Sequence, residues 1–168
     1  MKYDHYYIFE APIEFEPTRQ FLDWLSAHPT GNILFSITSR GGLVTTARLL
    51  LKALNDNKDR ITIHVLGGVY SAAFLITYEY EGAKALTRNE SKGMFHYGIQ
   101  MLSTDERGQV VYKEDRVCLR NLKLAREESQ TFASQFMNKA ELNSFRKGDD
   151  VYFDFKRMSE IFPTATVI

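Results

Sequence analysis

The stretch HVLGGVYSAAFLI (residues 64–76) carries the strongest fold signal in the chain. A short apolar run ends in two glycines, and Ser71 then opens a row of small and apolar residues. Apolar β-branched residues followed by glycine indicate a buried strand, and the row after Ser71 is typical of a buried helix. Ser71 thus lies at a predicted strand-to-helix junction, where a serine acts either as a helix N-cap or as a nucleophile.

The same alternation of strand and helix extends to both sides of this stretch. We expect helices at residues 16–28, 43–57 and 71–80, and short strands at residues 5–12, 32–38, 61–66, 83–86 and 93–97. Strands that alternate with helices form a parallel sheet with right-handed crossovers, so the fold class is predicted to be α/β. In such sheets sites form at the carboxyl ends of strands, where the segments SRGG, GGVYS and MFHY lie.

The second half of the chain has a different pattern. We expect a hairpin at residues 99–113, a long helix at 114–137, a short helix at 138–148, and then a brief strand and a helix within DDVYFDFKRMSEIF (149–162). There is no repeat and no linker. The chain is therefore predicted to be one domain over residues 1–168, with an insertion at about 99–148 that contacts a partner subunit.

Composition excludes several classes of function. The chain has 168 residues, of which 44% are hydrophobic. Its 21 basic residues balance its 21 acidic ones, so the net charge does not favour binding to nucleic acid or to an anionic membrane. The one cysteine, Cys118, excludes an intrachain disulfide and a cysteine metal cluster. The first residues do not read as a secretory leader, and no apolar run reaches the roughly 20 residues of a membrane span. We expect a cytoplasmic protein without cofactor, metal, nucleic-acid or membrane partner.

Serine chemistry on an acyl group requires a base, oxyanion donors and an orienting carboxylate beside the nucleophile. His96 in GMFHYG is the candidate base, because it closes a short apolar strand after Ser71. The N–H groups of Gly42 in SRGG and of Ala72 are the candidate oxyanion donors. Taken singly, each of three candidates has a structural explanation: Ser71 as a helix cap, Gly42 as part of a βα turn, and His96 as a structural histidine.

The remaining histidines and the aspartates are assigned less sharply. His5 and His28 lie near the ends of predicted elements and are expected at the surface, whereas His64 lies inside a strand and reads as a structural histidine. The candidate carboxylates are clustered near the C-terminal end of the chain: Asp149, Asp150 and Asp154.

Together these segments resemble the Clp protease proteolytic subunit (ClpP) family of the ClpP/crotonase superfamily. YYIFEAPIEFE resembles the opening strand of that family, and NILFSITSRGGLVTTARLLLKAL resembles the block whose second glycine supplies an oxyanion N–H, here Gly42. ITIHVLGGVYSAAFLI resembles the nucleophile block, which implies Ser71 as nucleophile and Ala72 as the other donor. GMFHYG resembles the block of the base, His96. Ser71 follows Gly42 by 29 positions and precedes His96 by 25, which matches the family pattern without a gap.

The match weakens toward the C-terminal end. DDVYFDFKRMSEI resembles the family block that contains the aspartate, which implies Asp150 with Asp149 as a rival. Arg40 replaces the proline of the family turn, HYG replaces the residues expected at the base, and residues 99–113 are polar where a glycine-rich substrate strand is expected. The sequence also opens almost at the first strand, without a segment matching the family's axial loops.

The resemblance implies a ClpP-like spiral of β-β-α units around a mainly parallel sheet, with a helical and hairpin handle. It implies a serine endopeptidase with Ser71, His96 and Asp150 as a triad, acting on a peptide or unfolded protein within stacked homo-oligomeric rings. An ATP-driven unfoldase partner stays open. The alternatives are a catalytically silent ClpP-like scaffold or binding subunit, an acyl-CoA enzyme of the crotonase type, and a serine–lysine peptidase.

Overall fold

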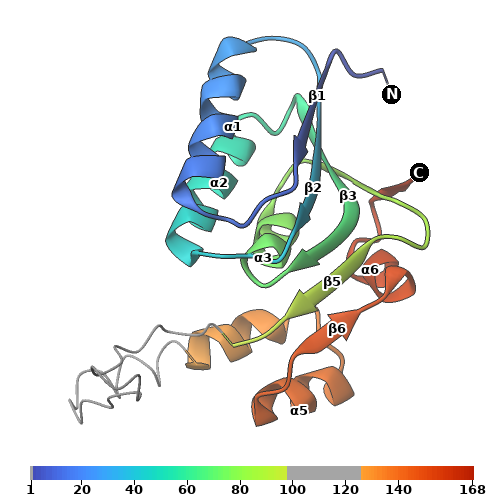
Figure 1. Ribbon diagram of the computed structural model, residues 1–168. Coiled ribbons are helices and arrows are strands. Elements are labelled where there is room, and N and C mark those ends of the chain that lie inside the picture. Colours follow the sequence, from blue (N-terminus) through green and yellow to red (C-terminus); the bar gives the residue numbers. More distant parts are fainter. Residues whose placement is uncertain (1, 98–125) are drawn as a thin grey trace, which may run out of the picture. The chain divides into compact units, whose positions relative to one another are not determined.

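The structure, a computed structural model, describes residues 2–97 and 126–168 of the chain (Figure 1). It divides into two compact units, which are described separately. Unit 1 comprises Met1–Phe95 and Tyr152–Ile168, and unit 2 comprises His96–Val151.

The predicted parallel sheet is confirmed. Its strands are β1 (His5–Phe9), β2 (Ile33–Ser39), β3 (Ile61–Tyr70), β4 (Ala83–Leu86), β5 (Lys92–Phe95), β6 (Val151–Phe153) and β7 (Thr166–Val167). The order is β1-β2-β3-β4-β7, with β5 beside β3 and β6 beside β5. All pairs from β1 to β4, and the pairs β3–β5 and β4–β7, are parallel.

Helices follow the strands of unit 1 as the periodicity predicts. They are α1 (Phe15–Ala27), α2 (Val44–Asp56), α3 (Ala72–Glu79) and α6 (Phe155–Ile161). Figure 1 shows α1 and α2 side by side on one face of the sheet. Between α1 and the sheet, the rings of Tyr7, Phe21 and Phe35 lie with centroids 4.7 to 6.0 Å apart. Burial of such large aromatic side chains provides the main stabilisation of this layer.

Strand β3 is longer than predicted. The sequence indicated a strand over 61–66 that ended at two glycines, but β3 continues through Gly67 and Gly68 to Tyr70. Residues 62–65 pair with β4, whereas residues 68–70 pair with β5. The register with β2 shifts between these two parts, because Thr38 alone faces the three residues 66–68. The glycines therefore belong to a bulge that redirects the strand rather than to a turn that ends it.

Unit 2 contains two helical segments among its described residues. Residues 126–133 are helical, and α5 spans Lys139–Lys147. Asn138 begins α5 with a capping box, in which its side chain accepts from the N–H groups of Ala140 and Glu141, and Gly148 ends it at a φ of 97°. The rings of Tyr97 and Phe145 stack with centroids 4.2 Å apart.

Several predictions lie outside the described residues. These are the hairpin at 99–113, the first part of the long helix predicted at 114–137, and Cys118. Among the helices that the structure describes, none is long and apolar enough to cross a membrane.

Candidate functional site

Ser71 lies at the sharp turn between β3 and α3 with unusual backbone angles. Its φ is 55° and its ψ is −120°, a combination that residues with a Cβ rarely adopt. It occupies the N-cap position, yet its side chain makes no capping hydrogen bond to the first turn of α3, whose residues are all described. Its backbone N–H donates instead to Met94 O on β5, 2.8 Å away. A capping role therefore does not account for this serine.

Hydrogen bonds hold the turn after β2 both internally and against the segment before α1. Ser39 Oγ donates to Ala11 O at 2.6 Å, and the Gly41 N–H donates to Ser39 Oγ at 3.2 Å. The Ile13 N–H donates to Gly41 O at 2.8 Å. Bonds on both sides of residue 40 leave the backbone of this turn little freedom to move.

Gly41 brings this turn into contact with Ser71. A Cβ at Gly41 would lie 2.6 Å from Tyr70 O, 2.8 Å from Ser71 Cβ and 3.0 Å from Ala72 N, and its φ of 91° also favours glycine. Real Cβ atoms do not approach other atoms so closely. Glycine at this position therefore lets the turn pack directly on the residue predicted to be the nucleophile.

Two backbone N–H groups next to this contact are available as donors. Ala72 is the first residue of α3, so its N–H has no partner within the helix, and the side chain is almost fully buried. Neither Ala72 N–H nor Gly42 N–H donates to a carbonyl among the described residues. Such donors, together with the positive end of a helix dipole, favour an oxyanion at this place.

His96 and Asp150 lie together within unit 2. His96 Nδ1 is 3.3 Å from Asp150 Oδ1, and the two side chains are 21% and 47% exposed. A carboxylate on Nδ1 favours the tautomer that leaves Nε2 without a proton and able to accept one. The pair thus has the arrangement of an oriented general base.

The other two candidate aspartates have different partners. Asp149 Oδ2 accepts from Ser144 Oγ at 2.6 Å, which ties it to the end of α5. Asp154 is the N-cap of α6, and its Oδ1 accepts from the Arg157 N–H at 2.8 Å. Of the three aspartates left open by the sequence, Asp150 is the one paired with His96.

The remaining histidines are structural. His64 is buried, with Nδ1 3.0 Å from Ser36 Oγ and Nε2 2.7 Å from Thr87 Oγ1, which confirms the prediction for this residue. Burial lowers the pKa of His64. His5 and His28 are partly buried rather than at the surface, because both rings pack beside Trp24.

An aromatic pair that the sequence analysis did not single out lies next to Ser71. The rings of Tyr70 and Tyr152 meet edge to face with centroids 6.3 Å apart, and Tyr152 is 67% exposed. A Cβ at Gly68 would lie 2.5 Å from the Tyr70 ring, so this glycine makes room for it. The alternation in VYF (151–153), which points Tyr152 away from the core, was the signal available in the sequence.

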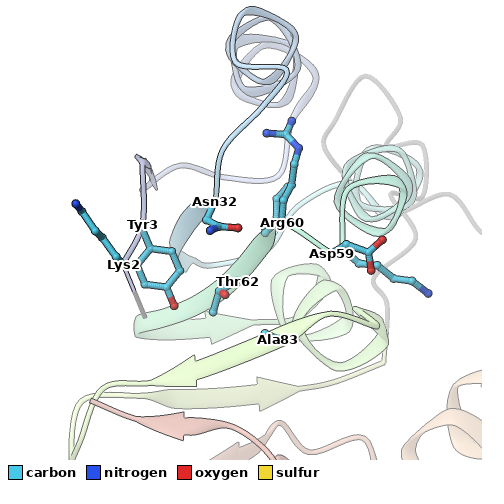
Figure 2. A pocket seen from close by; sticks show the side chains of 9 residues that line it. Lys2, Tyr3, Asn32, Asp59, Arg60, Thr62 and Ala83 are labelled. Atoms are coloured by element: carbon cyan, nitrogen blue, oxygen red, sulfur yellow. The ribbon is translucent and has the colours of Figure 1, made fainter.

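A hollow of about 310 Å³ lies away from these residues, near the amino ends of β2, β3 and β4 (Figure 2). Two of its cationic side chains already have partners, since Lys58 pairs with Glu81 and the Arg60 guanidinium donates to His28 O and Gly31 O. Among the described residues, no group of three or more His, Cys, Asp or Glu side chains is placed to bind a metal ion. The hollow is lined by Lys2, Tyr3, Asn32, Lys58, Asp59, Arg60, Ile61, Thr62 and Ala83.

Comparison with known proteins identifies the fold. No protein-family model matches the sequence, and no curated protein matches it. Among solved structures, a mutant of ClpP1 from Listeria monocytogenes aligns over 97% of this chain and 90% of its own, with 13% identity and a TM-score of 0.68. A peptidase from Plasmodium falciparum aligns over 97% of this chain and 94% of its own, with 12% identity and a TM-score of 0.63. The chain therefore has a ClpP-like peptidase fold.

Proposed function

We propose that this protein is a ClpP-like serine endopeptidase with Ser71 as its nucleophile. The observation that supports this most strongly is the backbone of Ser71, which is strained although its hydroxyl makes no capping hydrogen bond. Strained residues persist where the surrounding structure enforces them, and they cluster at active sites. A serine on a sharp strand-to-helix turn is exposed to substrate and lies beside the N–H groups of the following helix.

In the proposed reaction, Ser71 Oγ attacks the carbonyl carbon of a peptide bond while its proton passes to His96 Nε2. The N–H groups of Gly42 and Ala72 donate to the oxyanion of the tetrahedral intermediate. His96 then returns the proton to the leaving amine, the C–N bond breaks, and an acyl-enzyme forms. Water, activated by His96, hydrolyses the acyl-enzyme and regenerates Ser71.

Chain connectivity supports the assignment of His96 as the base. The Ser71 N–H is bonded to Met94 O, and His96 follows Met94 by two residues. Two residues of extended chain span at most about 7 Å between their Cα atoms, so the backbone of His96 starts near Ser71. Asp150 on His96 Nδ1 then supplies the third member of the triad and stabilises the imidazolium that forms.

We further propose that the substrate is a peptide or an unfolded protein, and that the protein works in the cytoplasm as a homo-oligomer of stacked rings. The likeness in fold to a ClpP1 supports these proposals. An ATP-driven unfoldase partner would be an extension of the same proposal. A parent protein that assembles into oligomers but has no peptidase activity would favour the alternative, a catalytically silent scaffold.

The test is intact mass spectrometry after exposure to a fluorophosphonate, which phosphonylates activated serines. We expect one adduct on the parent protein, none on Ser71→Ala, and a rate at least about a hundredfold lower on His96→Ala. Ser26→Ala is the matched control, because Ser26 is an exposed serine whose Oγ donates to Leu22 O. No adduct on a folded, oligomeric parent, or an adduct that survives in Ser71→Ala, would refute the proposal.

A further inference from the structure

We propose that Arg40 makes this site selective for peptides with an acidic side chain within about two residues of the scissile bond. This inference rests on the proposed function, because it concerns the substrate of the site built around Ser71. Arg40 stands in the turn SRGG, between the end of β2 and the glycine that contacts Ser71.

The backbone of Arg40 is held in place from both sides. Ser39 before it is bonded through its side chain to Ala11 O, and Gly41 after it accepts from the Ile13 N–H. The Gly41 N–H also donates back to Ser39 Oγ, across the Arg40 peptide. The long side chain therefore starts from a fixed point.

That point is close to the proposed nucleophile. A Cβ at Gly41 would lie 2.8 Å from Ser71 Cβ. Adding a Cα–Cβ bond and one Cα–Cα step of 3.8 Å places Arg40 Cα at most about 8 Å from Ser71 Cβ. An arginine side chain is about 6 to 7 Å long, so its guanidinium can reach substrate residues on either side of the bond that Ser71 attacks.

Arg40 is exposed and its charge is not neutralised within the described part of the chain. It forms no ion pair and no side-chain hydrogen bond there. Glu14, which follows the Ile13 that is bonded to this turn, does not pair with it. Arg19 and Lys52, by contrast, each pair with an acidic residue of their own helix.

Several side chains exposed near the turn are apolar. Leu43 and Val44, which follow Gly42, are 53% and 46% exposed, and Phe15 is 66% exposed. Low-polarity neighbours reduce the screening of a nearby charge by water. Because a guanidinium also bonds a carboxylate bidentately, an acidic side chain is the complementary group for this position.

The expected preference is moderate. For two solvent-exposed unit charges about 8 Å apart, an effective dielectric constant of about 40, between the values for a protein surface and for bulk water, corresponds to a change in rate constant of about fivefold. Such an effect should disappear at 1 M salt, where the Debye length falls to about 3 Å.

The experiment uses pairs of peptidyl phosphonates that differ only in Glu against Gln, either at the residue joined to phosphorus or at the one before it. Each reagent labels an activated serine, so a single mass measurement gives both the labelled residue and the second-order rate constant. The full-length parent is compared with Arg40→Gln and Arg40→Glu. Arg88→Gln is the control, because Arg88 is exposed and follows β4.

We expect the Glu reagent to label Ser71 about five times faster than the Gln reagent in the parent and in Arg88→Gln. The ratio should fall to about one in Arg40→Gln and below one in Arg40→Glu. Labelling of Ser71 at equal rates by both reagents of each pair, or an unchanged ratio in Arg40→Gln, would overturn the inference while leaving the proposed function intact. Absence of labelling at Ser71 with every reagent would overturn the proposed function itself.

Discussion

Replacing Ser71 by glycine is predicted to stabilise the protein while abolishing its activity. At a φ of 55° and a ψ of −120°, a residue with a Cβ pays a conformational cost of about 1 to 3 kcal/mol. Glycine removes this cost but loses about 0.5 to 1 kcal/mol through the greater entropy of its unfolded chain. The net expectation for Ser71→Gly is a free energy of unfolding about 1 kcal/mol higher than that of the parent.

A serine that only caps a helix would behave in the opposite way. Loss of a capping side chain costs about 1 kcal/mol in a change to alanine and a few tenths in a change to glycine. Because Ser71 does not cap α3 through its side chain, Ser71→Ala should change the free energy of unfolding by less than about 0.5 kcal/mol. Asn138→Ala provides the contrast, since Asn138 is a true cap and should lose about 1 kcal/mol.

The assay is urea unfolding, followed by far-ultraviolet circular dichroism and by the fluorescence of Trp24, the one tryptophan of the chain. In thermal unfolding, a gain of 1 kcal/mol should raise the midpoint by about 2 to 4 °C for a chain of this size. A Ser71→Gly protein that is less stable than the parent would refute the strain argument. So would a Ser71→Ala protein that loses as much as Asn138→Ala.

Three further predictions follow from the same contacts. Gly41→Ala should lower the free energy of unfolding by about 3 kcal/mol and slow the labelling of the nucleophile. Gly148→Ala is the control and should cost only about 1 kcal/mol, because Gly148 has a similar φ but no atom within 4 Å of the position of an added Cβ. Equal losses in urea unfolding would contradict the contact between Gly41 and Ser71. Asp150→Asn should reduce the rate of fluorophosphonate labelling at least about tenfold, whereas Asp149→Asn should reduce it less than about threefold. A larger reduction in Asp149→Asn than in Asp150→Asn would exclude Asp150 as the group that orients His96. Burial lowers the pKa of His64 in the folded state, so as the pH falls the unfolded state takes up a proton at this residue before the folded state does. The stability due to His64 is therefore complete above the unfolded pKa and is lost as the pH falls through and below it. The free energies of unfolding in urea at pH 7.5 and pH 5.5 should differ less in a His64→Gln protein than in the parent.

The parallel sheet and its helices could be predicted from the sequence because each element has a clear periodicity. The strand predicted at 32–38 and the helix at 43–57 lie within one residue of β2 and α2. Strand β7 was missed, since Thr166 and Val167 are exposed and their pairing with β4 depends on contacts far along the chain. The extension of β3 was missed because glycines usually end a strand, and only the pairing of residues 68–70 with β5 keeps it extended.

For the candidate site, the sequence predicted which residues to consider but not their geometry. Spacing could not distinguish Asp150 from Asp149, because adjacent residues fit the same alignment and only the contact of Asp150 Oδ1 with His96 Nδ1 separates them. The strain at Ser71 is a property of φ and ψ that no residue pattern reveals. The contact of Gly41 with Ser71 depends on two distant turns that meet at one edge of the sheet.

The most direct test of the account is a crystal structure of the protein after fluorophosphonate treatment. We predict phosphorus bonded to Ser71 Oγ, with the phosphonyl oxygen about 2.7 to 3.1 Å from the N–H nitrogens of Gly42 and Ala72, and with His96 Nε2 facing Ser71. An adduct whose oxygen lies more than about 4 Å from both nitrogens, or a His96 side chain directed away from Ser71, would contradict the account.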